Sequence, residues 1–440
     1  MPEYKKKKHS RIFSSPKKPK RNRRVKTDDY DEIKMSPEKE VKIKSVAQSN
    51  MKVVKGRKLE QRKKALISAI IISCVLIFLL VFQLIFPAGL FESVTNSISV
   101  FGSGSYPIEL ESTETINALS RGSYYYVLTN SHISAYTNAG KELFSYSHGF
   151  EKPIIKTSST RALVFNQGGV SALIFNNNGL KETLTTENEI LCGGISDSGT
   201  YALATISDEY ASAVSVYNKQ NKLIYEWFSA ENTVNNVAIS PNGKKIAVSA
   251  FSSSVGKYVS TLSVLNYKSA TPEFYEKLEG TLVYNIDTFS SNYFAMVSTN
   301  KIKFFKWSNL KSVEHANDYN LSFYKSGKGG SVAVFNRESD KTDNKIEIYS
   351  KSGQKKAEFN FKGIISDIQL FGNHIYCMSE TDIYLLSSDG KVLRKTSCGF
   401  GAIRLVVTGT NTVCVITDNE IEKYKLESEE TKWALQLIWF

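Results

Sequence analysis

A motif that recurs about every 40 residues constrains the fold of this 440-residue chain more than any other feature. In each copy an aromatic or aliphatic residue closes a short apolar strand. In most copies a turn of Asn, Ser, Asp or Gly follows, and a second strand begins after it. The strand-closing residues are spaced by 39, 42, 48, 42, 42, 37 and 38 residues. They are Tyr136, Phe175, Tyr217, Leu265, Trp307, Tyr349, Leu386 and Tyr424.

This period predicts a four-stranded sheet repeated around a ring, because such a sheet can bury its faces only against neighbouring sheets. Gly and Asn suit the turns, since tight hairpins need positive φ angles. The three-to-four periodicity of helices is missing from this region. We therefore expect an all-β fold over residues 106–428, a β-propeller of about eight four-stranded blades, with seven blades as the alternative.

The two ends of this region suggest how the ring closes. The last repeat offers only three strand segments, at 402–408, 412–417 and 421–426. Residues 106–111, ahead of the first repeat, form a further alternating segment. Pairing it with the last repeat would cover an edge that otherwise invites aggregation. We therefore expect residues 106–111 to supply the fourth strand.

Three segments carry a resemblance to known repeats. Ser240-Pro241-Asn242-Gly243 and Ser196-Asp197-Ser198-Gly199 each precede an apolar strand, and Thr288–Tyr293 matches them by position. These segments resemble the Ser-Pro-Asp-Gly turn between the two inner strands of bacterial WD-like blades. The strand joints resemble quinoprotein-type (PQQ-like) blades, and the whole layout resembles an uncharacterised family of membrane-anchored propellers from low-GC Gram-positive bacteria. The resemblance implies architecture and no particular activity.

An apolar run from Ala65 to Phe86 indicates a membrane anchor. It contains no charged residue, and 22 residues of helix would span roughly 33 Å, enough for the hydrocarbon core of a bilayer. Residues 1–64 hold 23 Lys/Arg and 8 Asp/Glu, which leaves 33 basic and 35 acidic residues in the rest of the chain. Basic residues beside a span stay on the cytoplasmic side. A cleaved signal peptide is disfavoured because the run is long and begins at residue 65. We predict a single-pass protein of the plasma membrane with residues 88–440 outside.

The segments that flank these two parts are less specific. Residues 1–64 are expected to be a disordered basic tail that enforces topology; contact with anionic lipid or a specific nucleic-acid or protein partner are the alternatives, with nucleic acid the unlikelier partner. Residues 87–105 read as a linker. Residues 429–440 form an apolar C-terminal tail too short to span a membrane. Packing against the propeller is favoured for this tail over docking in the membrane interface or on a partner.

The search for chemistry yields no catalytic, cofactor-binding or metal-binding residue. The histidines outside the basic tail lack metal-ligand spacing, and we expect surface or hydrogen-bonded roles for them: His132, His148, His315 and His374. The glycine-rich segment 327–331 reads as a hairpin turn. Residues Asp340–Asp343 read as a solvated hairpin tip and not a calcium site, because the ligand pattern is incomplete. Cys377 and Cys414, one repeat apart, are expected in equivalent strands, as buried free thiols or as a disulfide.

These observations favour a non-enzymatic binding or scaffold module held at the cell envelope, with an unknown protein, peptide or glycan on the propeller. Two alternatives stay open. One is an extracytoplasmic propeller enzyme of the hydrolase or quinoprotein kind, which a cluster of acids and histidine along the ring axis would favour. The other is a transmembrane ligand sensor.

Overall fold

The computed structural model describes residues 63–75, 77, 100, 102–111, 114–254, 256–327, 329–337 and 339–427. The chain divides into two units, residues 1–86 and 87–440. In the first unit, residues 63–75 and 77 are helical. Within the described ranges, no helix has both the length and the apolar character needed to cross a membrane. The predicted span 65–86 and linker 87–105 lie partly outside the described residues. The basic tail lies almost wholly outside them, and the C-terminal tail lies wholly outside them, so these four assignments stay predictions.

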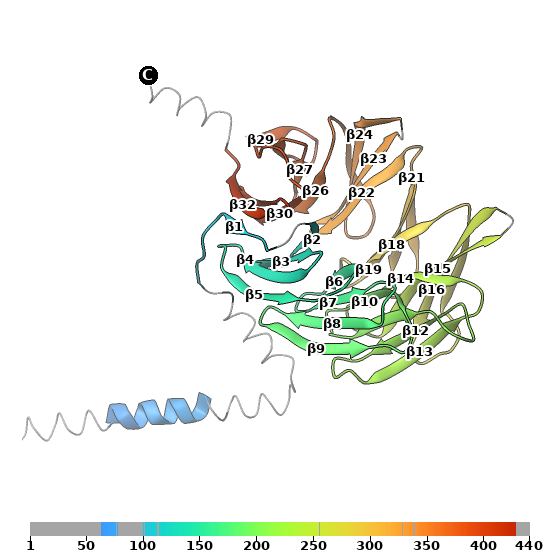
Figure 1. Ribbon diagram of the computed structural model, residues 1–440, viewed down its shortest axis with the longest axis horizontal. Coiled ribbons are helices and arrows are strands. Elements are labelled where there is room, and N and C mark those ends of the chain that lie inside the picture. The colour runs from blue at the N-terminus through green and yellow to red at the C-terminus, as the bar shows by residue number, and fades with distance from the viewer. Residues whose placement is uncertain are drawn as a thin grey trace, which may run out of the picture. The chain divides into compact units, whose positions relative to one another are not determined.

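The second unit is an eight-bladed β-propeller, as the repeat predicts, and its described residues contain no helix. Each blade is a four-stranded antiparallel sheet. The eight sheets follow one another in chain order around the ring (Figure 1). In seven blades the four strands are consecutive in the sequence, so each blade is a simple meander.

Blades 1 to 4 use strands β2 to β17, from the inner strand outward. Blade 1 has β2 (Thr115–Ser120), β3 (Tyr124–Thr129), β4 (His132–Thr137) and β5 (Glu142–Ser147). Blade 2 has β6 (Pro153–Thr157), β7 (Ala162–Asn166), β8 (Ser171–Asn176) and β9 (Gly179–Thr185). Blade 3 has β10 (Ile190–Ile195), β11 (Tyr201–Thr205), β12 (Ser212–Tyr217) and β13 (Leu223–Ser229). Blade 4 has β14 (Thr233–Ile239), β15 (Lys245–Ser254), β16 (Lys257–Asn266) and β17 (Phe274–Glu279).

Blades 5 to 8 use the remaining strands and the first strand of the chain. Blade 5 has β18 (Val283–Asp287), β19 (Tyr293–Ser298), β20 (Lys301–Lys306) and β21 (Ser312–Ala316). Blade 6 has β22 (Asn320–Gly327), β23 (Gly330–Arg337), β24 (Asp340–Tyr349) and β25 (Lys355–Lys362). Blade 7 has β26 (Asp367–Phe371), β27 (His374–Met378), β28 (Asp382–Leu386) and β29 (Val392–Ser397). Blade 8 has β30 (Arg404–Gly409), β31 (Thr412–Ile416), β32 (Glu420–Lys425) and β1 (Ile108–Glu109).

The core lies between the blades. The second and third strands are buried over most of their length, as in β3 and β8, because sheets covered on both faces read as continuous apolar runs. The outer strands β17 and β25 alternate between half-buried and exposed positions, since only one of their faces meets a neighbouring blade. A separate hydrophobic cluster of described residues fills each of the eight junctions between successive blades. One of them joins blade 8 to blade 1 and closes the ring.

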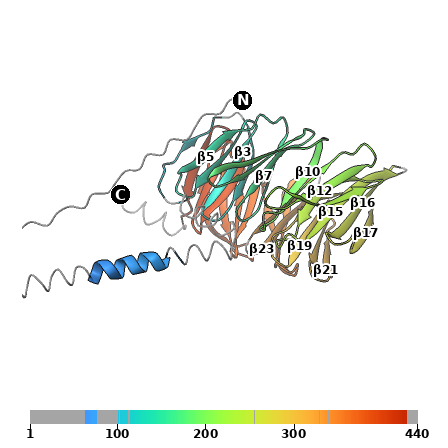
Figure 2. The same ribbon diagram turned by 90° about the horizontal axis from the view of Figure 1, so that it is seen from below.

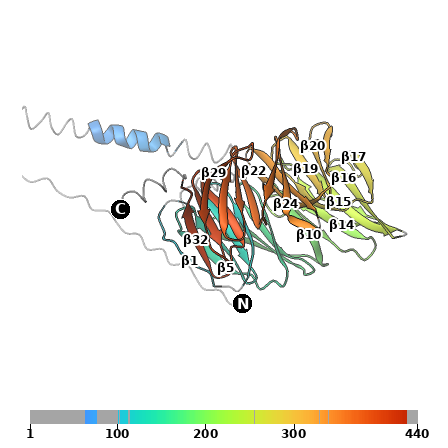
Figure 3. The same cartoon turned by 90° about the horizontal axis from the view of Figure 1, so that it is seen from above.

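Pairing between the two ends of the propeller completes the closure, as predicted for residues 106–111. β1 pairs antiparallel with β32, with Ile108 opposite Ile421 and Glu109 opposite Glu420. The blue-green strand β1 therefore lies beside the red strand β32 in Figures 1 and 3. The paired segment is shorter than predicted. Side chains extend the closure, because Arg404 donates to the carbonyl of Ile116 at 2.8 Å.

All eight strand-closing residues predicted from the repeat lie at the end of the third strand of a blade, or directly after it. Because neighbouring strands are antiparallel, the turn from the first to the second strand and the turn from the third to the fourth emerge at the same end of a blade. We call this end of the ring the turn face. Figure 2 shows the blades from the side, with their strands running between the two ends of the ring. Both motifs singled out in the sequence, the WD-like turns and the strand joints, lie on the turn face.

The cysteines are equivalent, as predicted. Cys377 lies in β27 and Cys414 in β31, the second strands of blades 7 and 8. Both are buried free thiols. They belong to different blade junctions, since Cys377 packs in the cluster between blades 6 and 7 and Cys414 in the cluster between blades 8 and 1.

Candidate binding site on the turn face

A pocket of about 480 Å³ opens on the turn face. Its walls come from four turns in four blades. Asp197 comes from blade 3, Pro241 from blade 4, residues 288–293 from blade 5 and Lys351 from blade 6. Three of these turns are the segments whose sequences resemble the turn of WD-like blades. The pocket thus brings together turns that the repeat places on one face without saying which of them meet.

The turns of blades 3 and 4 are rigid and linked to each other. In the first, the N–H of Gly199 donates to the carbonyl of Ser196 at 3.0 Å, and Gly199 has a φ of 82° that suits glycine. The second repeats this arrangement between Gly243 and Ser240 at 2.8 Å. The N–H of Ser198 donates to the carbonyl of Pro241 at 3.1 Å and joins the two turns.

The turn of blade 5 forms the largest part of the pocket and lacks glycine. The N–H of Tyr293 donates to the hydroxyl of Ser290 at 3.0 Å, and the carbonyl of Asn292 accepts from the N–H of Trp307 at 2.9 Å. The ring of Phe289 meets the buried ring of Phe304 edge to face, with 6.0 Å between centroids. The backbone of this turn is therefore held by the blade, while hydroxyl, amide and aromatic groups face the pocket.

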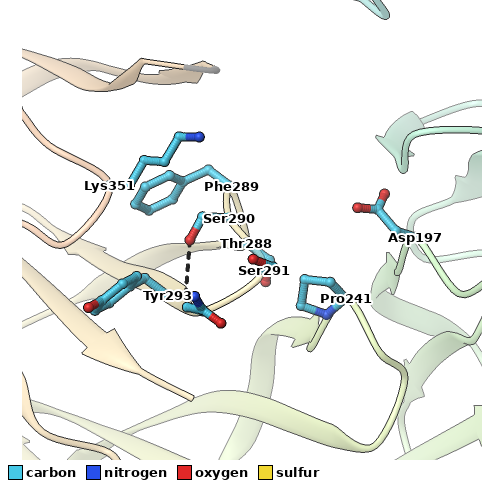
Figure 4. Close-up of a pocket in the computed structure, with 9 residues that line it drawn as sticks. Asp197, Pro241, Thr288, Phe289, Ser290, Ser291, Tyr293 and Lys351 are labelled. Carbon is cyan, nitrogen blue, oxygen red and sulfur yellow. Dashed lines mark hydrogen bonds between the residues drawn. The ribbon is translucent and has the colours of Figure 1, made fainter. Parts of the chain in front are cut away.

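Two opposite charges stand on opposite sides of the pocket. Figure 4 shows the ammonium of Lys351 above Phe289 on one side and the carboxylate of Asp197 on the other. One oxygen of Asp197 accepts the backbone N–H of Ser159 at 2.7 Å, which orients the carboxylate. Both charged side chains are exposed to solvent, and neither forms an ion pair with another residue that the structure describes.

Asp287, the last residue of the inner strand β18, directly precedes the pocket residue Thr288. Burial raises the pKa of the Asp287 carboxyl above its usual range, and the hydroxyl of Ser326 and the charges of three cations oppose that rise. Burial lowers the pKa of the Arg121 guanidinium, and Asp197 and Asp287 oppose that shift. The three cations around Asp287 come from blades 1, 2 and 6 and are Arg121, Lys156 and Lys325.

A second hollow, of about 380 Å³, lies at the opposite end of blade 6. Arg337 lies over the ring of Tyr319 at 5.0 Å and donates to its hydroxyl at 3.0 Å. The nearby segment Asp340–Asp343 differs from the prediction of a hairpin tip, because it forms the start of β24 and Asp340 pairs with Arg337. An ion pair of 2.7 Å between Asp343 and Lys362 of β25 extends the sheet to this point. Segment 327–331 is a hairpin turn between β22 and β23, as predicted.

Three of the four described histidines lie within hydrogen-bond distance of a neighbouring group, and none of the four lies on the inner strand of a blade. His132 lies 2.9 Å from the hydroxyl of Ser131. His148 and His315 lie 3.1 Å and 2.6 Å from backbone carbonyl oxygens. Burial lowers the pKa of His148, and its hydrogen bond to a backbone carbonyl opposes the shift. In the described part of the chain, no three His, Cys, Asp or Glu side chains gather as metal ligands would.

Sequence reasoning missed Asp197 and Lys351 as facing residues of one pocket. Both stand inside motifs that were read for architecture alone. The sequence did contain a signal for these two residues. Each is a charged residue in a turn of small polar residues, and such a residue projects from the turn face. What the repeat cannot supply is which turns lie together across the ring.

Fold and site define a WD-like β-propeller of eight blades with a polar pocket on its turn face. The chain belongs to the family of unknown function DUF5711, whose sequence profile matches residues 102–426. The match covers the whole described propeller except the last residue after β32. No curated protein matches the chain.

Two solved structures are similar to this chain. The C-terminal WD40 domain of Sif2 superposes with a TM-score of 0.53 over 74% of this chain and 100% of its own, at 10% sequence identity. BamB from Moraxella catarrhalis gives a TM-score of 0.47 over 74% of this chain and 99% of its own, also at 10% identity. At such low identity the likeness to the Sif2 domain shows a shared fold alone.

Proposed function

We propose that this protein is a membrane-anchored, non-enzymatic binding module whose propeller holds a polypeptide at the outer side of the plasma membrane. One observation carries the proposal. Four turns from four blades converge on a single polar pocket on the turn face, where hydrogen-bonding and aromatic groups are presented from a rigid ring. A pocket of this volume matches the roughly 300–1,000 Å³ of ligand sites in proteins.

The composition of the pocket favours a polypeptide ligand. Hydroxyl and amide groups from Ser290, Ser291 and Asn292 stand beside the rings of Phe289 and Tyr293. Surfaces rich in Tyr, Ser and Asn are those that antibodies use against proteins, because Tyr supplies contact area at low entropic cost and Ser and Asn adapt their hydrogen bonds. Short hydroxyl side chains on rigid turns give the same combination here.

The absence of an enzymatic role is part of the proposal. The described lining of the pocket supplies one carboxylate and one amine on opposite sides, with no histidine or cysteine beside either. Nucleophilic catalysis by a hydroxyl needs an activating base within hydrogen-bond reach, and the described lining offers no histidine for that role. The pocket is better suited to holding a ligand than to transforming it.

The membrane anchor rests on the sequence. The uncharged run from Ala65 to Phe86 follows a segment with a large excess of Lys and Arg, and this asymmetry favours a cytoplasmic N-terminus and an external propeller. This orientation places the basic tail on the cytoplasmic side, where anionic lipid would attract it.

This topology predicts selective labelling by a membrane-impermeant maleimide. In a Cys398→Ser background, the variant Lys391→Cys on the exposed turn of blade 7 should be labelled in intact cells, because it lies outside the membrane. Lys17→Cys in the basic tail should be labelled only after lysis. Labelling in the reverse order would show the opposite orientation, and equal labelling of both in sealed cells would show that no anchor separates them.

The binding site predicts where a partner can be trapped. A photo-crosslinking amino acid at Ser291, an exposed residue of the pocket, should give discrete covalent adducts in cells, identifiable by mass spectrometry. The matched control is Glu380, which is exposed in the hairpin between β27 and β28 at the opposite end of the ring. Capture of the same abundant envelope proteins from both positions, or of none, would contradict the proposal.

A further inference from the structure

The pocket presents two charges that form no ion pair with any residue that the structure describes. Asp197 and Lys351 face it from opposite sides (Figure 4). A single backbone N–H, that of Ser159, binds one oxygen of Asp197 and leaves the other facing solvent. The ammonium of Lys351 has no hydrogen-bond or ion-pair partner among the residues that the structure describes.

The surroundings keep these charges apart. Asp197 lies in a turn whose backbone is tied to blade 4 through Ser198, and the N–H of Ser159 holds one of its carboxylate oxygens. Lys351 extends from the turn closed by Gly353, whose N–H donates to the carbonyl of Ser350 at 3.0 Å. Between the two charges stand the hydroxyl and aromatic groups of the blade 5 turn.

We propose that the pocket selects polypeptide segments that carry one basic and one acidic side chain, the basic one placed at Asp197 and the acidic one at Lys351. This inference rests on the proposed function and adds the chemistry and direction of the ligand. Complementary charges fix register and reject wrong partners because a like-charge contact is repulsive. Two opposite charges on opposite sides allow one orientation of a bound segment and disfavour its reverse.

Defined peptides can test the selection directly. The full chain in detergent would be titrated by fluorescence polarisation with labelled, end-capped octapeptides of Ser, Asn, Gly and Tyr. Four sets carry Lys followed by Glu, Glu followed by Lys, one charge alone, or none, at varied separation. One order of the two charges should bind at least about tenfold more tightly than the uncharged set, and salt should weaken that preference.

Charge inversion supplies the decisive comparison. Asp197→Lys or Lys351→Glu alone should reduce binding of the preferred peptide about tenfold or more. The double inversion should restore binding and exchange the preferred order of Lys and Glu. Lys391→Glu, on the neighbouring turn of blade 7 and outside the pocket lining, is the matched control and should change nothing. Lys351→Gln adds a neutral variant, and an unchanged denaturation midpoint shows that each variant is folded.

The outcomes separate this inference from the proposed function. Equal binding of charged and uncharged peptides, or a preference that the double inversion leaves in the same order, would overturn the charge selection while crosslinking at Ser291 could still support a polypeptide ligand. Failure of every peptide set to bind would also overturn it. Loss of both peptide binding and crosslinking at Ser291 would overturn the proposed function as well.

Discussion

Replacing Asp367 by Ala should lower the free energy of unfolding by about 3 kcal/mol, because one buried carboxylate holds three blades together. Asp367 begins the inner strand of blade 7 and is 2% exposed. One oxygen accepts the N–H of Leu405 in blade 8 at 2.9 Å. The other lies 3.8 Å from the ammonium of Lys325 in blade 6. Alanine would leave a buried N–H without an acceptor and a cation without its partner. Equilibrium denaturation of the full chain in urea measures the loss.

Two further variants separate charge from hydrogen bonding. Asp367→Asn keeps an acceptor for Leu405 and should cost less than Asp367→Ala, about 1 kcal/mol. Gln369→Ala, two residues along the same strand and half-buried, is the matched control and should stay within about 0.5 kcal/mol of the parent. If Asp367→Ala were no more destabilising than Gln369→Ala, the contacts of the Asp367 carboxylate with blades 6 and 8 would contribute nothing to the free energy of unfolding.

The sequence repeat predicted most of the propeller because nearly every blade is built from four consecutive strands. Each repeat in the sequence therefore corresponds to one blade of the ring. Leu265 and Trp307 have turns without the shared glycine, yet they close third strands like the other copies. Each of these two apolar residues fills the junction with the preceding blade, and that role does not depend on the residues of the turn. The closure by residues 106–111 was predictable from counting strands, since an unpaired edge had to be covered.

One prediction was wrong because the backbone pairing of a strand continues beyond its apolar residues. Residues 340–343 are polar and read as a hairpin tip, but they belong to β24, where Asp340 pairs with Arg337 of β23 and Asp343 pairs with Lys362 of β25. Cross-strand pairs of opposite charge stabilise a sheet even where its side chains are exposed. Polar composition alone does not separate such a strand from a hairpin tip.

The composition of the pocket could not be predicted from the sequence, for a different reason. Pro241 and Lys351 come from blades 4 and 6, and their meeting depends on the tilt and spacing of blades that no period encodes. The electrostatic influence of Asp287 in blade 5 on Arg121 in blade 1 is of the same kind, since these blades stand four apart in the ring. The sequence predicts which residues are equivalent in successive blades, and the packing of the ring decides which of them are neighbours.

Replacing Tyr106 by Ala should lower the free energy of unfolding by about 2–3 kcal/mol, because this half-buried side chain joins the two ends of the ring. Its hydroxyl lies 3.2 Å from that of Tyr125 in blade 1 and accepts from the thiol of Cys414 in blade 8 at 3.3 Å. The ammonium of Lys423 lies 5.4 Å from the centre of its ring. The segment passes so close to blade 1 that a Cβ on Gly140 would come within 2.8 Å of the Tyr106 ring.

We call the pairing of β1 with β32, together with the Tyr106 side chain, the clasp. If the clasp closes the ring, the Tyr106→Ala variant should lose structure first around β1 and only later in the other blades. β1 pairs with β32 through only two residues, so without the Tyr106 ring its amides should lose hydrogen-exchange protection while those of blade 4 keep theirs. Tyr106→Phe retains the ring and should cost about 1 kcal/mol for the hydroxyl. Tyr258→Ala removes a tyrosine that is 61% exposed and should cost little. Equal stability of Tyr106→Ala and Tyr258→Ala, or uniform loss of protection around the ring, would show that closure rests on the hydrophobic junction between blades 8 and 1 and not on the clasp.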